Sequence, residues 1–357
     1  MVESVRNNFQ RKHGLIRFGR WLIFLLIGGV LLFFIWLAMP IEDFDSERLI
    51  IGESTAYVSL KLNLKDRGIK SLLNIVNDMY MRNSPAARAI PYLLPHKISA
   101  GIIYNIDNPK KHDYLVIADI GKRIRLLNII GRVLPYFTIK NLTVEYAAYH
   151  GYRVMILGGK NLQEISLAVV YGKIVASNNI EFLKKALDNV AEGKNSFFEQ
   201  PAINYLYRTA SRYDGVVLVN NISSRLTRIV RDAEDKYHYS IFPSVDTVAA
   251  IAAGVDIVDE DRVEGEMVLS QYHSSESEVV GEDMRFFAGF FRRILRAYDI
   301  DIHGDVTIQD NNVRFFFKGE GFRALWEKIL KGGFSHEKTS FNRTEHYLLA
   351  HTFCECG

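Results

Sequence analysis

The sequence predicts an α+β protein with one N-terminal transmembrane helix, followed by two tandem, similar α+β units whose sheets are mainly antiparallel. Three observations lead to this fold class. An uncharged apolar run occupies residues 21–39, short β-rich runs joined by turn residues dominate the rest of the chain, and the same order of predicted strands and helices occurs twice. We expect the first unit at residues 40–200 and the second at residues 201–331, between a basic tail at residues 1–20 and a C-terminal tail at residues 332–357.

The composition is that of an ordinary globular chain. Of its 357 residues, 48% are hydrophobic and 24% are charged, which excludes the fibrous and disordered classes. The net charge is only +3, so no overall basic field indicates a nucleic acid partner. The chain has 2 cysteines, Cys354 and Cys356, which excludes a disulfide framework.

The apolar run Trp21–Met39 has the length of a membrane span, because a helix rising ~1.5 Å per residue covers about 28 Å over residues 21–39. Basic residues precede the run and acidic residues come after it, which predicts a cytoplasmic N-terminus. The basic residues are Arg6, Arg11, Lys12, Arg17 and Arg20, and the acidic ones are Glu42, Asp43, Asp45 and Glu47.

The alternative interpretation of this run is a cleaved signal peptide. A signal peptide has a shorter apolar region of about 7–15 residues and a small-x-small cleavage site, and the exit Trp36–Pro40 lacks such a site. We therefore predict an uncleaved single-pass anchor in the inner (cytoplasmic) membrane. Residues 21–39 would contact the lipid bilayer, and the C-terminal domain would be periplasmic or extracytoplasmic.

The first unit is predicted from period-2 apolar patterns, which indicate strands, and from longer amphipathic patterns, which indicate helices. The predicted strands are Ala56–Leu62, Lys97–Ile106, Asp113–Asp119, Leu142–Tyr149 and Tyr152–Leu157, and the predicted helices are Asp66–Arg82 and Arg123–Tyr136. An additional hairpin is expected at Ile165–Ser177. Asn178, followed by Glu181, has the spacing of a capping box and predicts the start of a helix that runs through Val190.

The second unit repeats this order without the additional hairpin. Its predicted strands are Val216–Asn220, Val245–Val258, Arg262–Gln271, His303–Gln309 and Asn312–Lys318, and its predicted helices are Ser223–Lys236, Glu282–Tyr298 and Phe322–Leu330. Turn residues such as His150-Gly151 and Asp310-Asn311 separate neighbouring β-rich runs, which indicates antiparallel hairpins.

The strand Lys173–Ser177 runs directly into Asn178-Asn179, and Leu183 and Ala186-Leu187 lie beyond it on a predicted helix. With the strand-helix-hairpin order behind a single apolar run, this segment resembles uncharacterised bacterial single-pass envelope proteins that are known only as a domain of unknown function. The shared Ala176–Asn179 segment implies a strand end and a helix cap. The resemblance implies an extracytoplasmic α+β repeat and no assigned chemistry.

Two motifs before the C-terminal tail approach known sites. Gly52–Ala56 is one residue short of a G-x-S-x-G nucleophile elbow, but its serine precedes a strand instead of following one. Asp299, Asp301, Gly304 and Asp310 partly imitate a calcium loop, but His303 stands where a hard oxygen is needed and a strand should come next. We interpret the second motif as a helix end that leads into a strand, with Asp301, His303 and Asp305 alternating on its solvent face.

The C-terminal tail contains four side chains that bind soft metals, His346, His351, Cys354 and Cys356. Its C-x-C spacing is tighter than that of structural zinc sites, so we interpret these residues as incidental to a chain end. An intermolecular disulfide remains an alternative in an oxidising compartment. We therefore predict no catalytic, cofactor-binding or metal-binding residue and no cofactor.

The function predicted from these observations is non-enzymatic. We expect a membrane-anchored extracytoplasmic protein that binds a partner protein or a second copy of itself, or scaffolds an envelope assembly, because tandem sheets offer edges for strand addition. One alternative is a carrier or sensor of an apolar ligand or lipid, held in a cavity lined by the abundant aromatic residues. The other is an enzyme whose site is assembled from scattered residues.

Overall fold

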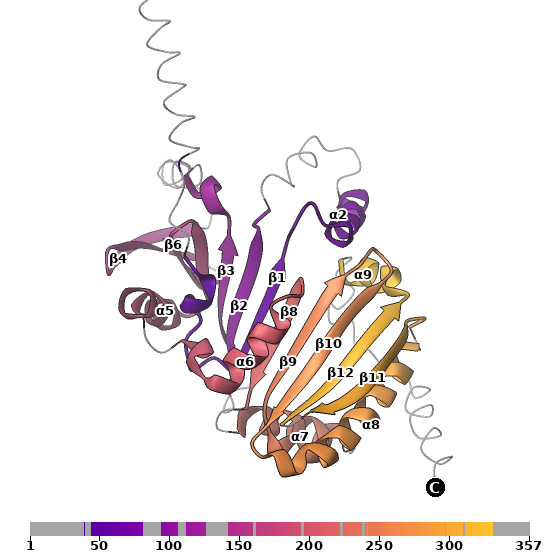
Figure 1. Cartoon of the computed structure of the whole chain (residues 1–357). Coiled ribbons are helices and arrows are strands. Elements are labelled where there is room, and N and C mark those ends of the chain that lie inside the picture. The colour runs from indigo at the N-terminus through magenta and orange to yellow at the C-terminus, as the bar shows by residue number, and fades with distance from the viewer. Residues whose placement is uncertain are drawn as a thin grey trace, which may run out of the picture. The chain divides into compact units, whose positions relative to one another are not determined.

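The computed structural model describes residues 39, 44–80, 94–105, 112–125, 142–159, 162–193, 196–221, 224–237, 240, 242–296, 298–309 and 311–330. These residues form two compact units (Figure 1). The first unit contains the described residues up to Leu62 and those from 94 to Asn204, and the second contains those from Asn63 to Tyr80 and from Tyr205 onward.

Twelve strands make up the β structure of the described chain. They are β1 (Ala56–Lys61), β2 (Lys97–Ile103), β3 (Asp113–Asp119), β4 (Leu142–Tyr149), β5 (Tyr152–Gly159), β6 (Leu162–Val170), β7 (Lys173–Ser177), β8 (Gly215–Asn220), β9 (Val248–Ile257), β10 (Val263–Gln271), β11 (Asp301–Gln309) and β12 (Asn312–Glu320).

Six α-helices and several short 3-10 helices accompany these strands in the described residues. The α-helices are α2 (Arg67–Tyr80), α5 (Ile180–Glu192), α6 (Pro201–Ala210), α7 (Arg225–Tyr237), α8 (Ser277–Arg296) and α9 (Phe322–Leu330). The 3-10 helices are η1 (Ser46–Leu49), η3 (Gly121–Arg123), η5 (Phe197–Glu199), η7 (Pro243–Thr247) and η8 (Ser274–Glu276).

The predicted fold class is wrong. The twelve described strands belong to one antiparallel sheet, whereas the sequence predicted two tandem units with mainly antiparallel sheets and left open whether the units share one. The error has a physical reason, because pairing between strands far apart in the chain leaves no periodic signal in the sequence. The predicted transmembrane helix Trp21–Met39 lies, except for Met39, outside the described residues, and none of the described helices is both long and apolar enough to cross a membrane.

Strand order has the same scheme in both units. In the second unit the order is β8-β9-β10-β12-β11, and in the first it is β1-β2-β3-β7-β6-β5-β4. The additional hairpin β6–β7 is therefore inserted between β3 and β5. Its loop, Tyr171-Gly172, has positive φ at both residues, as a two-residue hairpin turn of type I′ requires.

One face of the first unit's sheet is covered by η1 and α5. Tyr57, Leu115 and Val175 point to this face from three strands and are fully buried. Helix α5 begins at Asn179, whose side chain accepts a hydrogen bond of 3.0 Å from the backbone N–H of Glu181. The predicted cap, Asn178, instead bonds the backbone of Tyr114 and His112, because its side chain points back to β3.

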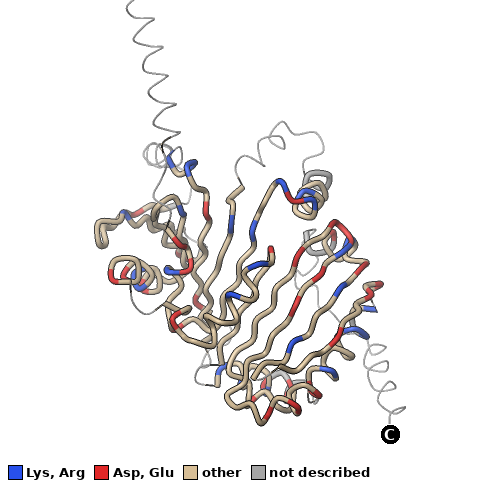
Figure 2. The backbone as a smooth tube through the Cα atoms, in the orientation of Figure 1, with Lys and Arg blue, Asp and Glu red and all other residues tan. Residues whose placement is uncertain are grey.

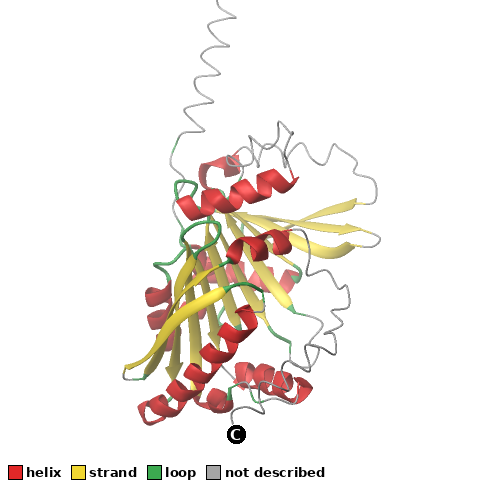
Figure 3. Cartoon of the chain, turned by 90° about the vertical axis from the view of Figure 1, so that its right-hand side faces the viewer, coloured by secondary structure: helices red, strands yellow, loops and turns green. Residues whose placement is uncertain are grey.

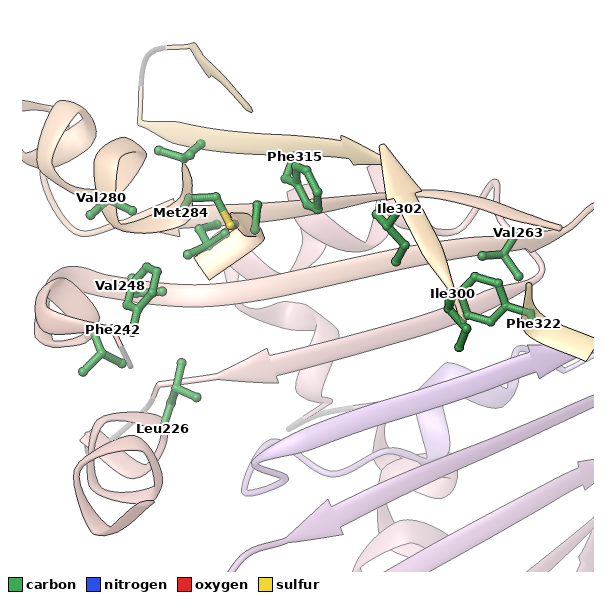
Figure 4. Close-up of a cluster of buried hydrophobic side chains, with 14 residues drawn as sticks. Leu226, Phe242, Val248, Val263, Val280, Met284, Ile300, Ile302, Phe315 and Phe322 are labelled. Carbon is green, nitrogen blue, oxygen red and sulfur yellow. The ribbon is translucent and has the colours of Figure 1, made fainter. Parts of the chain in front are cut away.

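The core of the second unit lies between its sheet and helices α7, α8 and α9 (Figures 3 and 4). Val280, Met284 and Ala288 repeat every four residues on α8, so one stripe of the helix packs against Val313 and Phe315 of β12. The predicted helix Arg123–Tyr136 lies mostly outside the described residues. Helix α6 was not predicted, and it supplies the fully buried side chains Ile203 and Leu206.

Candidate functional site

Among the described residues of the second unit, the most deeply buried ionic group is the Glu266 carboxylate on β10, whose side chain is 1% exposed. Arg212 Nη2 donates to Glu266 Oε2 at 2.5 Å, and the Tyr213 hydroxyl donates to the same oxygen at 3.3 Å. Arg314 Nη1 lies 3.3 Å from Oε1, and its Nη2 donates to the Tyr205 hydroxyl at 2.9 Å. The carboxylate is thus shared by groups from two other segments of the chain, residues 212–213 and Arg314.

A glycine on the neighbouring strand makes this arrangement possible. Gly254 on β9 pairs with Glu266, and a Cβ atom at Gly254 would lie 2.1 Å from the ring of Tyr213. The ring therefore lies directly on β9, which brings its hydroxyl to Glu266. Burial is the main reason that the pKa of Tyr213 is raised. Both carboxylate oxygens are engaged, so we interpret this group as a clamp that holds residues 205–214 on the sheet.

Two surface hollows of the second unit lie among polar side chains. One, of about 360 Å³, is lined by residues of β10, β11 and β12, including Glu264, His303, Phe316 and Lys318. The Lys318 ammonium lies 3.2 Å from the Glu264 carboxylate, and both side chains are largely exposed. The other, of about 450 Å³, is lined by Arg67 and Ser71 of α2, the loop 259–262 and Glu320. In neither hollow does a described serine, threonine or cysteine hydrogen-bond a base, as a hydroxyl or thiol nucleophile of a catalytic site would.

A second buried carboxylate, Glu47, lies in η1 of the first unit. It accepts hydrogen bonds from the Tyr57 hydroxyl at 2.8 Å and from Ser46 Oγ at 3.0 Å, and it forms an ion pair with Lys97. A hydrogen bond to Glu47 is the largest cause that raises the pKa of Asp45 to about 6, with burial second. Two carboxyl groups and a lysine resemble acid–base machinery, but Tyr57 is fully buried, so no substrate reaches Glu47 from its side.

The two motifs that resemble a nucleophile elbow and a calcium loop lack the geometry of those sites. Ser54 is buried in the turn before β1, so the strand–turn–helix geometry of a nucleophile elbow is absent there. Asp299 is exposed with a φ of 61°, and Asp301 begins β11, so the calcium-loop pattern falls on a strand. The Arg296 hydrogen bond is the first cause that lowers the pKa of Asp301, whose carboxylate also lies 2.8 Å from His303.

The remaining candidate metal ligands of the sequence analysis belong to segments that the structure does not describe. Asp310 and the tail residues His346, His351, Cys354 and Cys356 lie outside the described residues. Within the described part of the chain, no group of three or more His, Cys, Asp or Glu side chains could hold a metal ion.

Among the described strands of the first unit, β4 is the outermost (Figure 1), and most of its side chains are solvent-exposed. It pairs with β5 through the two-residue loop His150-Gly151, where φ is 46° and 81°. The pair that closes such a loop exchanges both backbone hydrogen bonds, so residues 149, 147, 145 and 143 bond β5. Val144, Tyr146 and Ala148 therefore direct their backbone N–H and C=O groups to the outer edge.

The β4–β5 hairpin is held in place by side chains at both of its faces. The Tyr149 hydroxyl donates to Asp188 of α5 at 2.9 Å, and His150 Nε2 lies 3.0 Å from the same carboxylate. On the other face the Arg153 guanidinium lies 3.8 Å from the ring centroid of Tyr146. The outer edge is thus preorganised for binding, because the strand is already ordered.

The outermost strand of the second unit, β11, differs from β4 in its charge. β11 has Asp301, His303 and Asp305, whereas Glu145 is the only charged residue of β4, and Figure 2 shows the difference. Arg292 Nη2 also donates to the backbone oxygen of Gly304 at 3.4 Å. Charged side chains are devices by which natural sheets block edge-to-edge pairing, and β4 has only one.

The outer edge of β4 is therefore the candidate functional site, and it is a binding surface instead of a catalytic centre. Little in the sequence indicated this site, because the run Leu142–Tyr149 predicted a strand but not the position of that strand at the edge of the sheet. No family model, curated protein or solved structure matches the chain.

Proposed function

We propose that the protein is a non-enzymatic binding protein that holds a partner polypeptide by strand addition at the outer edge of β4. One observation carries this proposal: an ordered eight-residue edge strand with a single charge directs the backbone groups of three residues away from β5, to its outer edge. A partner strand gains main-chain hydrogen bonds along this edge, and side chains such as Tyr146, which is 37% exposed, select among partners.

The alternative of a lipid carrier has less support. A carrier buries most of its ligand in an apolar cavity, whereas the two hollows of the second unit named above are open to solvent, and charged side chains line both. The enzyme alternative also has less support, because the buried carboxylates Glu47 and Glu266 are both already paired.

Site-specific photo-cross-linking in the native host tests the proposal. The photoreactive amino acid p-benzoylphenylalanine replaces Tyr146 in the full chain, and the matched control replaces Phe291 on α8, an aromatic residue of similar exposure at 40%. We expect a discrete cross-linked protein from position 146 and none from position 291. Adding Val144→Lys should reduce the yield about tenfold, equivalent to about 1.4 kcal/mol of binding.

Two results would overturn the proposal. A lipid adduct in place of a protein at position 146 would favour the carrier. Absence of any adduct at position 146, in a chain whose thermal unfolding is unchanged, would show that the edge has no partner.

A further inference from the structure

From the geometry of β4 we infer that its partner is a second copy of this chain, paired antiparallel about a twofold axis through Tyr146. This inference rests on the proposed function, since it names the occupant of the same edge. A twofold interface brings the same residues of both copies together, so β4 must be complementary to itself in backbone hydrogen bonding, in charge and in side-chain packing.

Backbone geometry restricts the possible registers. In an antiparallel pair of strands, a residue whose backbone groups hydrogen-bond the neighbouring strand stands opposite a residue that does the same. A residue whose backbone groups point away from that strand stands opposite another such residue. Val144, Tyr146 and Ala148 direct their backbone groups outward, so they can pair only among themselves. The twofold axis must therefore pass through one residue of β4 and not between two.

Charge distinguishes the two registers whose axis lies near the middle of β4, one through Glu145 and one through Tyr146. An axis through Glu145 places the two Glu145 carboxylates directly opposite, which destabilises the pair. An axis through Tyr146 places Val144 opposite Ala148 and Glu145 opposite Ala147, so no like charges meet. Val144, Tyr146 and Ala148 of each copy then bond one another, and the two Tyr146 rings face each other across the axis.

The flanking residues are compatible with this register. Arg153 reaches from β5 to the ring of Tyr146, so each Tyr146 ring at the axis has the guanidinium of its own copy over it. Tyr149 stays bonded to Asp188 on the opposite face.

Register-specific disulfide formation tests the inference. In full chains carrying Cys354→Ser and Cys356→Ser, one preparation carries Glu145→Cys and the other Ala147→Cys. With the axis at Tyr146, these cysteines stand opposite in the mixed dimer at about 4.5 Å between Cα atoms, within disulfide reach. In either unmixed preparation, equal cysteines are displaced along the strands to about 8 Å, beyond that reach.

We expect oxidation to cross-link the mixture and neither preparation alone, and native mass spectra of the unmodified chain to show a dimer. Cross-linking of Ala147→Cys alone, in which Glu145 is intact, or failure of the mixture to cross-link would overturn the proposed register. A monomeric chain whose Tyr146 photo-adduct contains a different protein would overturn the second copy as partner and leave the proposed function intact. A monomer without any adduct would overturn both.

Discussion

Replacing Glu266 by Gln tests whether the buried carboxylate holds the second unit together. The substitution preserves shape but removes the charge that faces Arg212 and Arg314. Breaking a buried ion pair costs about 3–5 kcal/mol, because the remaining charge stays without compensation. Arg212 is 58% exposed and water can solvate it, whereas Arg314 is 22% exposed. We therefore expect Glu266→Gln to lower the free energy of unfolding by about 3 kcal/mol, the lower end of that range.

Urea denaturation monitored by tryptophan fluorescence measures this loss. Trp326 on α9 packs against the core of the second unit, so a Trp21→Phe, Trp36→Phe background makes the signal specific for that unit. With a slope of about 2 kcal/mol per molar urea, the midpoint should fall by about 1.5 M. Glu264→Gln is the matched control: it lies on the same strand in an exposed ion pair and should cost less than about 0.5 kcal/mol.

A result in which Glu266→Gln and Glu264→Gln differ by less than about 0.5 kcal/mol would refute the reasoning. Together with its two single variants, the double variant Glu266→Leu, Arg314→Met forms a double-mutant cycle. It should be more stable than Glu266→Gln, because apolar replacement of both partners leaves no buried charge between them.

Two further predictions concern pH and packing. The pKa of Asp45 is about 6 in the folded chain against 3.8 without its neighbours, so only the unfolded chain releases this proton between those values. The free energy of unfolding of the wild type should therefore fall as pH rises from about 4 to about 6, and Asp45→Asn should remove that fall. An unchanged pH dependence in urea titrations of the variant would contradict the raised pKa of Asp45 as its cause. Gly289→Ala should raise stability by up to about 1 kcal/mol, because open space surrounds this helical glycine. Gly254→Ala should lower stability by about 2 kcal/mol or more, because the new methyl group would displace Tyr213, and equal thermal midpoints for the two variants would contradict this account.

Local structure was largely predictable, because it depends on patterns within a few residues. Strands β3 and β4 and helix α9 have the predicted bounds. Helix α6 was missed, although Pro201 at its first position and buried apolar residues at 203, 206 and 210 are typical signals of a helix. The cap of α5 is one residue later than predicted, since two consecutive asparagines both fit the pattern.

The candidate site could not be predicted to the same extent. A strand is at an edge only in relation to the other strands, and the order β7-β6-β5-β4 arises because a hairpin is inserted beside β3. The clamp at Glu266 joins residues up to about one hundred positions apart, such as Tyr205 and Arg314. No local pattern reports such proximity.

The sequence by itself determined the composition, the apolar run at residues 21–39 and the succession of strands and helices, because these depend on side-chain type and short-range periodicity. Tertiary structure decided which carboxylates are buried and paired, which faces are covered and which strand presents its backbone groups to solvent. These properties result from long-range packing and hydrogen bonding. Glu145 and Glu266 have chemically identical side chains, but Glu145 is exposed on an edge strand, whereas Glu266 is buried and paired with two arginines.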